Sequence, residues 1–147
     1  MKSLLLCALI AMSFTSFAQT EPVKGNSKII ITTSLSPKEA YKSTLKKLIS
    51  EGYFVDLQDS VNFYIKTQPV PIKKSSLVGY YNLVFPDGQI VISGMGKAGY
   101  NITLWGVTTI ADYYPITYGG MKNSPMRRSF EFLQELASKF SETITYK

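Results

Sequence analysis

Histidine is absent from the sequence, and cysteine occurs once. Without histidine the chain cannot build a Ser-His-Asp or Cys-His catalytic set, nor hold zinc or haem through imidazole. A single cysteine excludes a disulfide framework. Acidic residues are also scarce, because 10 Asp and Glu stand against 16 Lys and Arg, for a net charge of +6. These shortages exclude the commonest catalytic and metal-binding sets.

The remaining composition is that of one ordinary globular domain. The chain has 147 residues, of which 45% are hydrophobic and 18% are charged. A chain of this length buries about 70% of its unfolded surface, which is enough for a core without disulfides. No internal repeat or second domain is visible.

The N-terminus has the three parts of a secretory signal peptide. Lys2 supplies the positive charge, residues 4–12 are an apolar run, and Ser16-Phe17-Ala18 fits the small-x-small cleavage site. The apolar run is too short for a spanning helix, which needs about 20 residues. We expect residues 1–18 to be removed after Ala18, and the protein to be periplasmic or secreted.

The position of the single cysteine shows whether the N-terminus fits a lipoprotein signal instead. Cys7 follows Leu6 inside the apolar run, whereas a lipoprotein cysteine follows a small residue at the cleavage point. Cys7 therefore leaves with the signal. The remaining 129 residues, 147 less 18, carry a net charge of +5 because Lys2 is lost.

Two helices have clear start signals. Ser36-Pro37-Lys38-Glu39 is a capping box, and Tyr41, Leu45, Leu48 and Ile49 form an apolar stripe that ends at Gly52. Ser124-Pro125 repeats the start signal before a second amphipathic helix. The stripe of that helix consists of Met126, Phe130, Leu133, Ala137 and Phe140, widened by Phe132 and Leu136.

The rest of the chain reads mostly as strands and turns. We expect a flexible leader over 19–27, an exposed basic connection over 68–76, a loop over 112–123 and a short tail over 143–147. The expected strands are 28–33, 53–57, 61–67, 77–85, 89–93 and the β-rich stretch 100–110.

This element order predicts the fold class. The order β-α-β-β-β-β-β-α, with hairpin turns between strands, favours an α+β domain over residues 28–147. We expect an antiparallel sheet of five to six strands, with the two helices packed on one face.

One glycine motif resembles a nucleotide-binding fingerprint, but the sequence around it does not fit such a site. Residues 94–99, GMGKAG, match G-x-G-x-x-G, but the segment that follows is β-rich rather than helical. No acidic residue about 20 positions later completes the fingerprint. We interpret the motif as a flexible hairpin loop.

Carboxylates give little support for an enzyme. A hydrolase of the glycosidase kind needs two carboxylates facing one cleft, and Asp59 with Asp112 is the pair that folding could join. Turn formation explains these residues better. We therefore expect no catalytic residue, no metal site and no cofactor.

Aromatic and basic residues in the second half define the candidate binding surface. Tyrosine on an open sheet face can stack on a ligand, although it is also a good strand former. Arg127-Arg128 begin the second helix, where an anion could bind, or where they are only a solvated basic end. The export signal argues against a nucleic-acid partner. The candidate surface consists of Tyr80, Tyr81, Trp105, Tyr113, Tyr114, Tyr118, Arg127 and Arg128.

One stretch supports a resemblance. Residues 48–57 (LISEGYFVDL), the Asp59-Ser60 turn and residues 65–67 (IKT) resemble small envelope domains of the helix-grip or TBP-like type. These include BamC-like domains of outer-membrane assembly lipoproteins and exported domains of Bacteroidetes-like bacteria. The resemblance covers about residues 28 to 68. It implies an envelope α+β domain and carries over no catalytic residue, and the chain departs from BamC in lacking a lipobox.

Three functions follow as hypotheses. The first is a non-enzymatic binding or scaffolding domain for a protein or envelope component. The second is a carrier of a small apolar ligand, in a cavity between the sheet and the second helix. The third is the hydrolase with Asp59 or Asp112. The carrier cavity would be lined by Phe130, Leu133, Leu83 and Trp105.

Overall fold

A computed structural model describes residues 21–105, 107–141 and 143–147. The predicted signal peptide and the first residues of the leader lie outside this range. The described elements are β1 (Lys28–Thr32), α2 (Pro37–Ser50), β2 (Val55–Asp59), β3 (Tyr64–Thr67), β4 (Val70–Pro71), β5 (Leu77–Val84), β6 (Gln89–Ala98), β7 (Ile102–Leu104), β8 (Val107–Thr109), β9 (Tyr114–Pro115), α3 (Pro125–Ser138) and β10 (Ile144–Tyr146).

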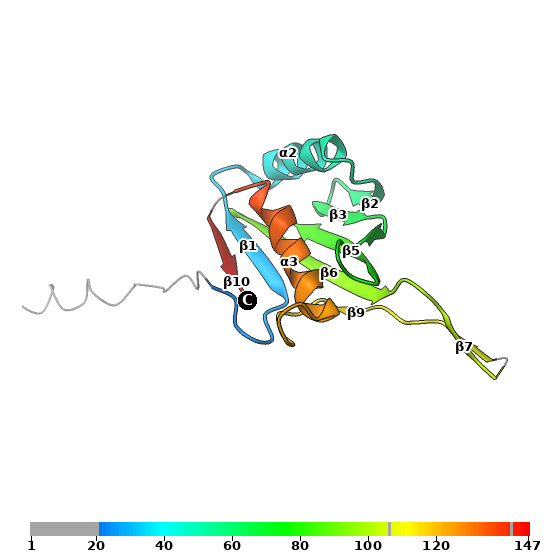
Figure 1. Ribbon diagram of the computed structural model, residues 1–147. Coiled ribbons are helices and arrows are strands. Elements are labelled where there is room, and N and C mark those ends of the chain that lie inside the picture. The colour runs from blue at the N-terminus through cyan, green and yellow to red at the C-terminus, as the bar shows by residue number, and fades with distance from the viewer. Residues whose placement is uncertain (1–20, 106, 142) are drawn as a thin grey trace, which may run out of the picture.

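The α+β class with an antiparallel sheet is confirmed. The main sheet has eight strands in the order β10-β1-β6-β5-β3-β2, with β4 paired to β5 and β9 paired to β6. A separate two-stranded sheet is formed by β7 and β8. In Figure 1, α3 lies across the front of the sheet and α2 lies at its upper end.

The strand count differs from the prediction because three short strands were missed. β10 lies in the expected tail, β4 in the expected basic connection and β9 in the expected loop. Each is defined by pairing: Ile144–Tyr146 of β10 pair with the distant Ile29–Ile31, whereas β4 pairs with the nearby start of β5. Strands of two or three residues are too short to show a period of two. The connection over 68–76 is also not fully exposed, since Ile72 is buried.

The first helix begins as predicted. The Ser36 hydroxyl accepts from the backbone N–H of Glu39, and the Glu39 carboxylate accepts from the backbone N–H of Ser36. Gly52 follows the helix with a φ of 83°, the left-handed conformation that glycine tolerates. The stripe differs in one residue, because Ile49 is exposed and the buried face carries Ala40 and Thr44 instead.

β2 and β3 form a hairpin, but its strands do not alternate regularly between the two faces. A register shift between Val55 and Leu57 interrupts the alternation, so Leu57 does not share the partly buried position of Val55 and is exposed. The second strand of this hairpin, β3, begins at Tyr64, later than the predicted start at residue 61. Val61 is exposed in the turn, and Phe63 adopts a φ of 49°.

The glycine-rich stretch is a strand, not the loop we predicted. β6 continues through Gly94 and Gly96 to Ala98 and pairs with β5 along its length. Both glycines face the side chain of Ile116: a Cβ on Gly94 would lie 2.9 Å from Ile116 Cδ1, too close to fit without a shift, whereas a Cβ on Gly96 would make an ordinary contact at 3.5 Å. Glycine here allows the Ile116 side chain to pack closely against the sheet. This packing role accounts for the glycine motif without a phosphate-binding function.

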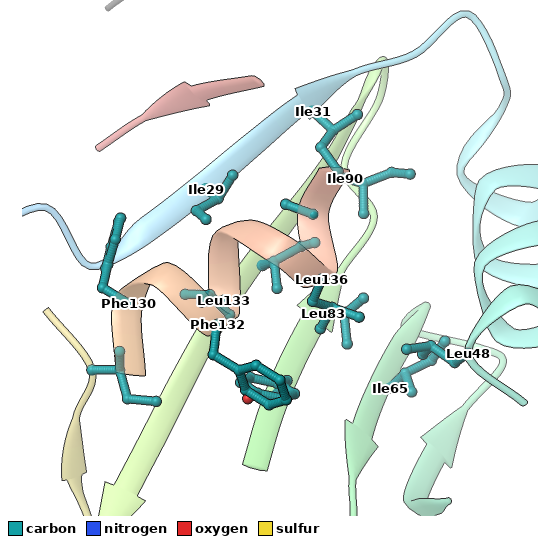
Figure 2. Close-up of a cluster of buried hydrophobic side chains, with 14 of the residues drawn as sticks. Ile29, Ile31, Leu48, Ile65, Leu83, Ile90, Phe130, Phe132, Leu133 and Leu136 are labelled. Carbon is teal, nitrogen blue, oxygen red and sulfur yellow. The ribbon is translucent and has the colours of Figure 1, made fainter. Parts of the chain in front are cut away.

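The helices and the inner face of the sheet enclose one core. Leu136 of α3 lies beside Leu83 of β5, while Leu48 of α2 lies beside Ile65 of β3 (Figure 2). Each such buried side chain contributes about 1.5–3 kcal/mol. An ion pair between Lys139 and Glu51 joins the C-terminal ends of the two helices.

Backbone hydrogen bonds attach the end of the leader to the domain. Gly25 N–H donates to the carbonyl of Tyr118, Tyr118 N–H donates to Asn26, and Ser27 N–H donates to Lys147. The predicted boundary at residue 28 therefore lies within a hydrogen-bonded region.

Candidate functional site

The outer face of the sheet is the surface opposite both helices. Residues on this face alternate with the buried ones along β5 and β6, and they are partly exposed rather than buried. No described helix covers this face. Its central residues are Tyr64, Lys66, Val78, Tyr80, Asn82, Val84, Val91, Ser93, Met95 and Lys97.

Two tyrosines and two lysines form a cluster on this face, which we call the aromatic–lysine patch. The rings of Tyr80 and Tyr113 meet edge to face, with centroids 4.9 Å apart. Lys66 Nζ lies 4.6 Å from the Tyr80 ring centroid, and Lys97 Nζ lies 4.7 Å from that of Tyr113. Ring pairing and cation–π contacts at these distances hold the four side chains in place.

Polar partners beside the patch fix its charge and orientation. Tyr64 Oη donates to Asn82 Oδ1 at 2.7 Å, and Lys66 Nζ lies 3.0 Å from Asp56 Oδ2. The hydrogen bond with Asp56 raises the pKa of Lys66 above its usual value, so this ammonium stays charged. Because Asp56 offsets the charge of Lys66, the net positive charge of the aromatic patch comes from Lys97.

The predicted tyrosines divide between the two faces. Tyr80 and Tyr113 meet in the patch, whereas Tyr81 points to the opposite face and is fully buried. Tyr114 packs partly against the core, where burial raises the pKa of its hydroxyl. Trp105 lies fully exposed next to β7, away from the core.

The predicted residues at the start of α3 form a second, separate group. Tyr118 packs on Phe130 with ring centroids 5.3 Å apart, and the Arg127 guanidinium lies 3.9 Å from the Tyr118 ring. Arg127 Nε and Arg128 Nη1 lie 3.4 and 3.3 Å from the Glu131 carboxylate. Both arginines therefore have an acidic partner in the chain, which weakens the case for an anion site here.

Lys66 and Lys97 were missed as site residues. Lys66 could have been found, because it alternates with the buried residues of the predicted strand 61–67. Lys97 could not, because residues 94–99 read as a loop and only the pairing of β6 places it beside Tyr113.

Two grooves flank the end of α2. One has a volume of about 490 Å³ and lies between α3 and the α2–β2 turn, lined by Tyr53, Phe132, Glu135 and Lys139 among others. The buried Tyr81 ring contacts two of these lining residues, Tyr53 and Phe132, and its hydroxyl has no hydrogen-bond partner among the residues that the structure describes. Burial raises the pKa of that hydroxyl far above its usual value, so it stays protonated.

The other groove is apolar and lies beside the edge strand β2. It has a volume of about 540 Å³ and is lined by Leu45, Ile49, Phe54 and Val55 among others. None of the grooves described is lined by Phe130, Leu133 or Leu83, which are fully buried in the core. The structure does not bring these residues together with Trp105 around a cavity.

The carboxylates of the hydrolase hypothesis have other surroundings. Asp59 Oδ1 accepts from the backbone N–H groups of Val61 and Asn62, at 2.8 and 3.0 Å. These hydrogen bonds, with that of the Asn62 side chain, lower the pKa of Asp59 and use it as a turn former. Asp112 is exposed. Within residues 21–147 as described, no cluster of three or more metal-ligating acidic or cysteine side chains occurs.

The chain matches no known family profile and no curated protein. Among the described helices, neither is long and apolar enough to cross a bilayer.

Proposed function

We propose that the protein is an exported, non-enzymatic binding domain that holds a partner protein or envelope component on the aromatic–lysine patch. The observation that carries this proposal is the edge-to-face pair of Tyr80 and Tyr113, with Lys66 and Lys97 against the rings on an uncovered sheet face.

The geometry of the patch suits recognition because its side chains are already ordered. Tyrosine offers a large amphipathic surface with few rotatable bonds, so binding costs little conformational entropy. The lysines restrict the rings further and add positive charge, which favours an acidic partner. Strands β5 and β6, the longest in the sheet, provide a rigid support beneath it.

The apolar carrier is the second hypothesis, and it receives less support. Its ligand would lie between the sheet and α3, where the side chains of Phe130, Leu133 and Leu83 are in contact with the core and have no exposed surface. Entry of a ligand there would require the core to open.

A variant with both tyrosines removed tests the patch. We expect Tyr80→Ser with Tyr113→Ser to lose the partners that chemically cross-link to the native protein in its own envelope, while thermal stability falls only slightly. Phe54→Ser is the matched control, because Phe54 is an exposed aromatic residue outside the patch. Equal recovery of partners by the double variant and the control would refute the proposal.

Export needs its own measurement. The intact mass of protein recovered from the envelope should correspond to a chain that begins at Gln19. A full-length mass in a cytoplasmic fraction would contradict export without bearing on the patch.

A further inference from the structure

The hairpin of β7 and β8 stands apart from the main sheet. Its strands pair only with each other, with Ile102 opposite Thr109 and Leu104 opposite Val107. It follows β6 and projects away from the body of the domain (Figure 1). Because the hairpin lies outside the main sheet, pairing within that sheet does not explain its composition.

Trp105 occupies an unfavourable position in this hairpin. It lies in the two-residue connection between Leu104 and Val107, with a φ of 53°. Such turns favour Asn, Asp or Gly at this position, because a positive φ crowds other side chains. The indole is nonetheless 101% exposed, so packing within the domain does not compensate. A residue that breaks a local rule without a structural gain indicates a function.

The rest of the hairpin is also unusual in lacking charge. The 14 residues from Ala98 to Ala111 include no Asp, Glu, Lys or Arg. Tyr100 and Ile110, which flank the two strands, are 57% and 69% exposed. Lys97 immediately precedes this run, and the chain without its predicted signal peptide has a net charge of +5, because Lys2 is removed from the +6 of the full sequence.

We propose that this hairpin inserts its tip into the interfacial layer of an anionic membrane, with Trp105 as the anchor. Indole is enriched at membrane interfaces because it is apolar with one polar N–H group. The positive chain favours an anionic surface.

The dimensions fix the depth of insertion. Strands of three residues extend about 10 Å, which reaches the boundary between headgroups and acyl chains but is far short of the hydrocarbon core of about 30 Å. The contact is therefore shallow and peripheral.

The inference does not depend on the aromatic–lysine patch. Tyr80 and Tyr113 lie on the main sheet, and a failure of the patch to bind a partner leaves the hairpin unaffected. The two proposals are tested with different variants and different readouts.

Tryptophan fluorescence provides a direct test, because Trp105 is the single tryptophan of the chain. We expect its emission to shift to shorter wavelength on addition of vesicles that contain phosphatidylglycerol and phosphatidylcholine. Lipids with a nitroxide near the headgroup should quench it more strongly than lipids labelled deep in the acyl chain.

Sedimentation with the same vesicles tests the anchor. Trp105→Ser should weaken binding at least about tenfold, the scale of burying one large apolar side chain. Ile110→Ser should weaken binding less and retain the fluorescent reporter. Val61→Ser is the matched control, an exposed apolar residue in the β2–β3 turn, and it should bind like the native chain. Circular dichroism should show all three variants folded.

Three results would overturn the proposal. The first is unchanged tryptophan emission with anionic vesicles. The second is binding that Trp105→Ser and Val61→Ser reduce equally. The third is an emission shift caused by soluble envelope proteins but not by vesicles, which would assign the hairpin to a protein partner.

Discussion

The two faces of the main sheet are built from the same strands and differ in almost every physical respect. On β5, Leu83 is 0% exposed and packs in the core, while its neighbour Val84 is 41% exposed on the open face. Tyr81 is buried with an unpartnered hydroxyl, whereas the adjacent Tyr80 joins the aromatic–lysine patch. Strand alternation alone separates a face that holds the fold from a face available for binding.

The comparison predicts that stability resides on one face. Leu83→Ala should lower the free energy of unfolding by about 2–5 kcal/mol, because it leaves a cavity beneath α3. Val84→Ala should lower it by about 1 kcal/mol or less, because only strand preference and partial burial are lost. Urea unfolding of both variants measures the difference. Equal losses would mean that the open face is packed against something in solution.

A pair of glycines sharpens the comparison within the inner face. Gly79 and Gly96 are directly opposite in the sheet. A Cβ on Gly79 would clash with the Met95 carbonyl oxygen at 2.9 Å, whereas the nearest atom to a Cβ on Gly96 would be Ile116 Cγ1 at 3.5 Å, an ordinary contact distance. Gly79→Ala should cost about 1–3 kcal/mol, since backbone cannot move aside easily.

Gly96→Ala is the matched control. It should be neutral or stabilise by up to about 1 kcal/mol, because alanine restricts the unfolded chain. Thermal unfolding of the two variants gives the order, and a larger loss for Gly96→Ala would show that the inner face is packed differently.

Removing two different tyrosine hydroxyls should change the free energy of unfolding in opposite directions. Tyr81→Phe removes a buried hydroxyl that has no partner, so stability should stay the same or rise by about 1 kcal/mol. Tyr64→Phe removes a hydrogen bond to Asn82 and should cost about 0.5–1.5 kcal/mol. Chemical unfolding compares them. A clear loss for Tyr81→Phe would reveal a bound water or ligand at that hydroxyl.

The smallest effect concerns the ion pair that joins the two helices. Lys139, and then Lys47, hold the pKa of Glu51 below its usual value of 4.5. A lowered folded-state pKa stabilises the protein above about pH 4.5, and that stabilisation is lost as the pH falls through the lowered value.

Glu51→Gln removes this contribution. The variant should therefore be slightly less stable than the native chain at neutral pH and equally stable in acid. Unfolding midpoints between pH 7 and pH 3 measure the convergence. A difference that persists unchanged in acid would show that the carboxylate charge does not contribute.

Local patterns in the sequence predicted much of the fold. The capping box of α2, the Ser124-Pro125 start of α3 and the strand predicted over 77–85 each depend on residues close together, and each is present. The prediction was wrong where structure depends on distant partners. The strands β9 and β10 form only by pairing with distant strands, and β6 continues through Gly94, which faces the Ile116 side chain across the inner face.

For the candidate site too, the sequence predicted what depends on single residues and neighbours, and not what depends on distant partners. Composition placed Tyr80 and Tyr113 among eight candidate surface residues, but their contact requires the return of the chain after the β7–β8 hairpin. Alternation showed that one of Tyr80 and Tyr81 must be buried, and it could not say which. The cations of the patch come from β3 and the end of β6, and only the register of three strands brings them to the rings.

The most direct test of the binding face is photo-cross-linking in the living cell. A photoreactive amino acid would replace Tyr113 in the patch or, as a control, Lys42 on the exposed side of α2. We predict a discrete cross-linked product from position 113 and none from position 42. A product from position 42 alone would place the partner on the helical side and contradict the assignment of the open sheet face.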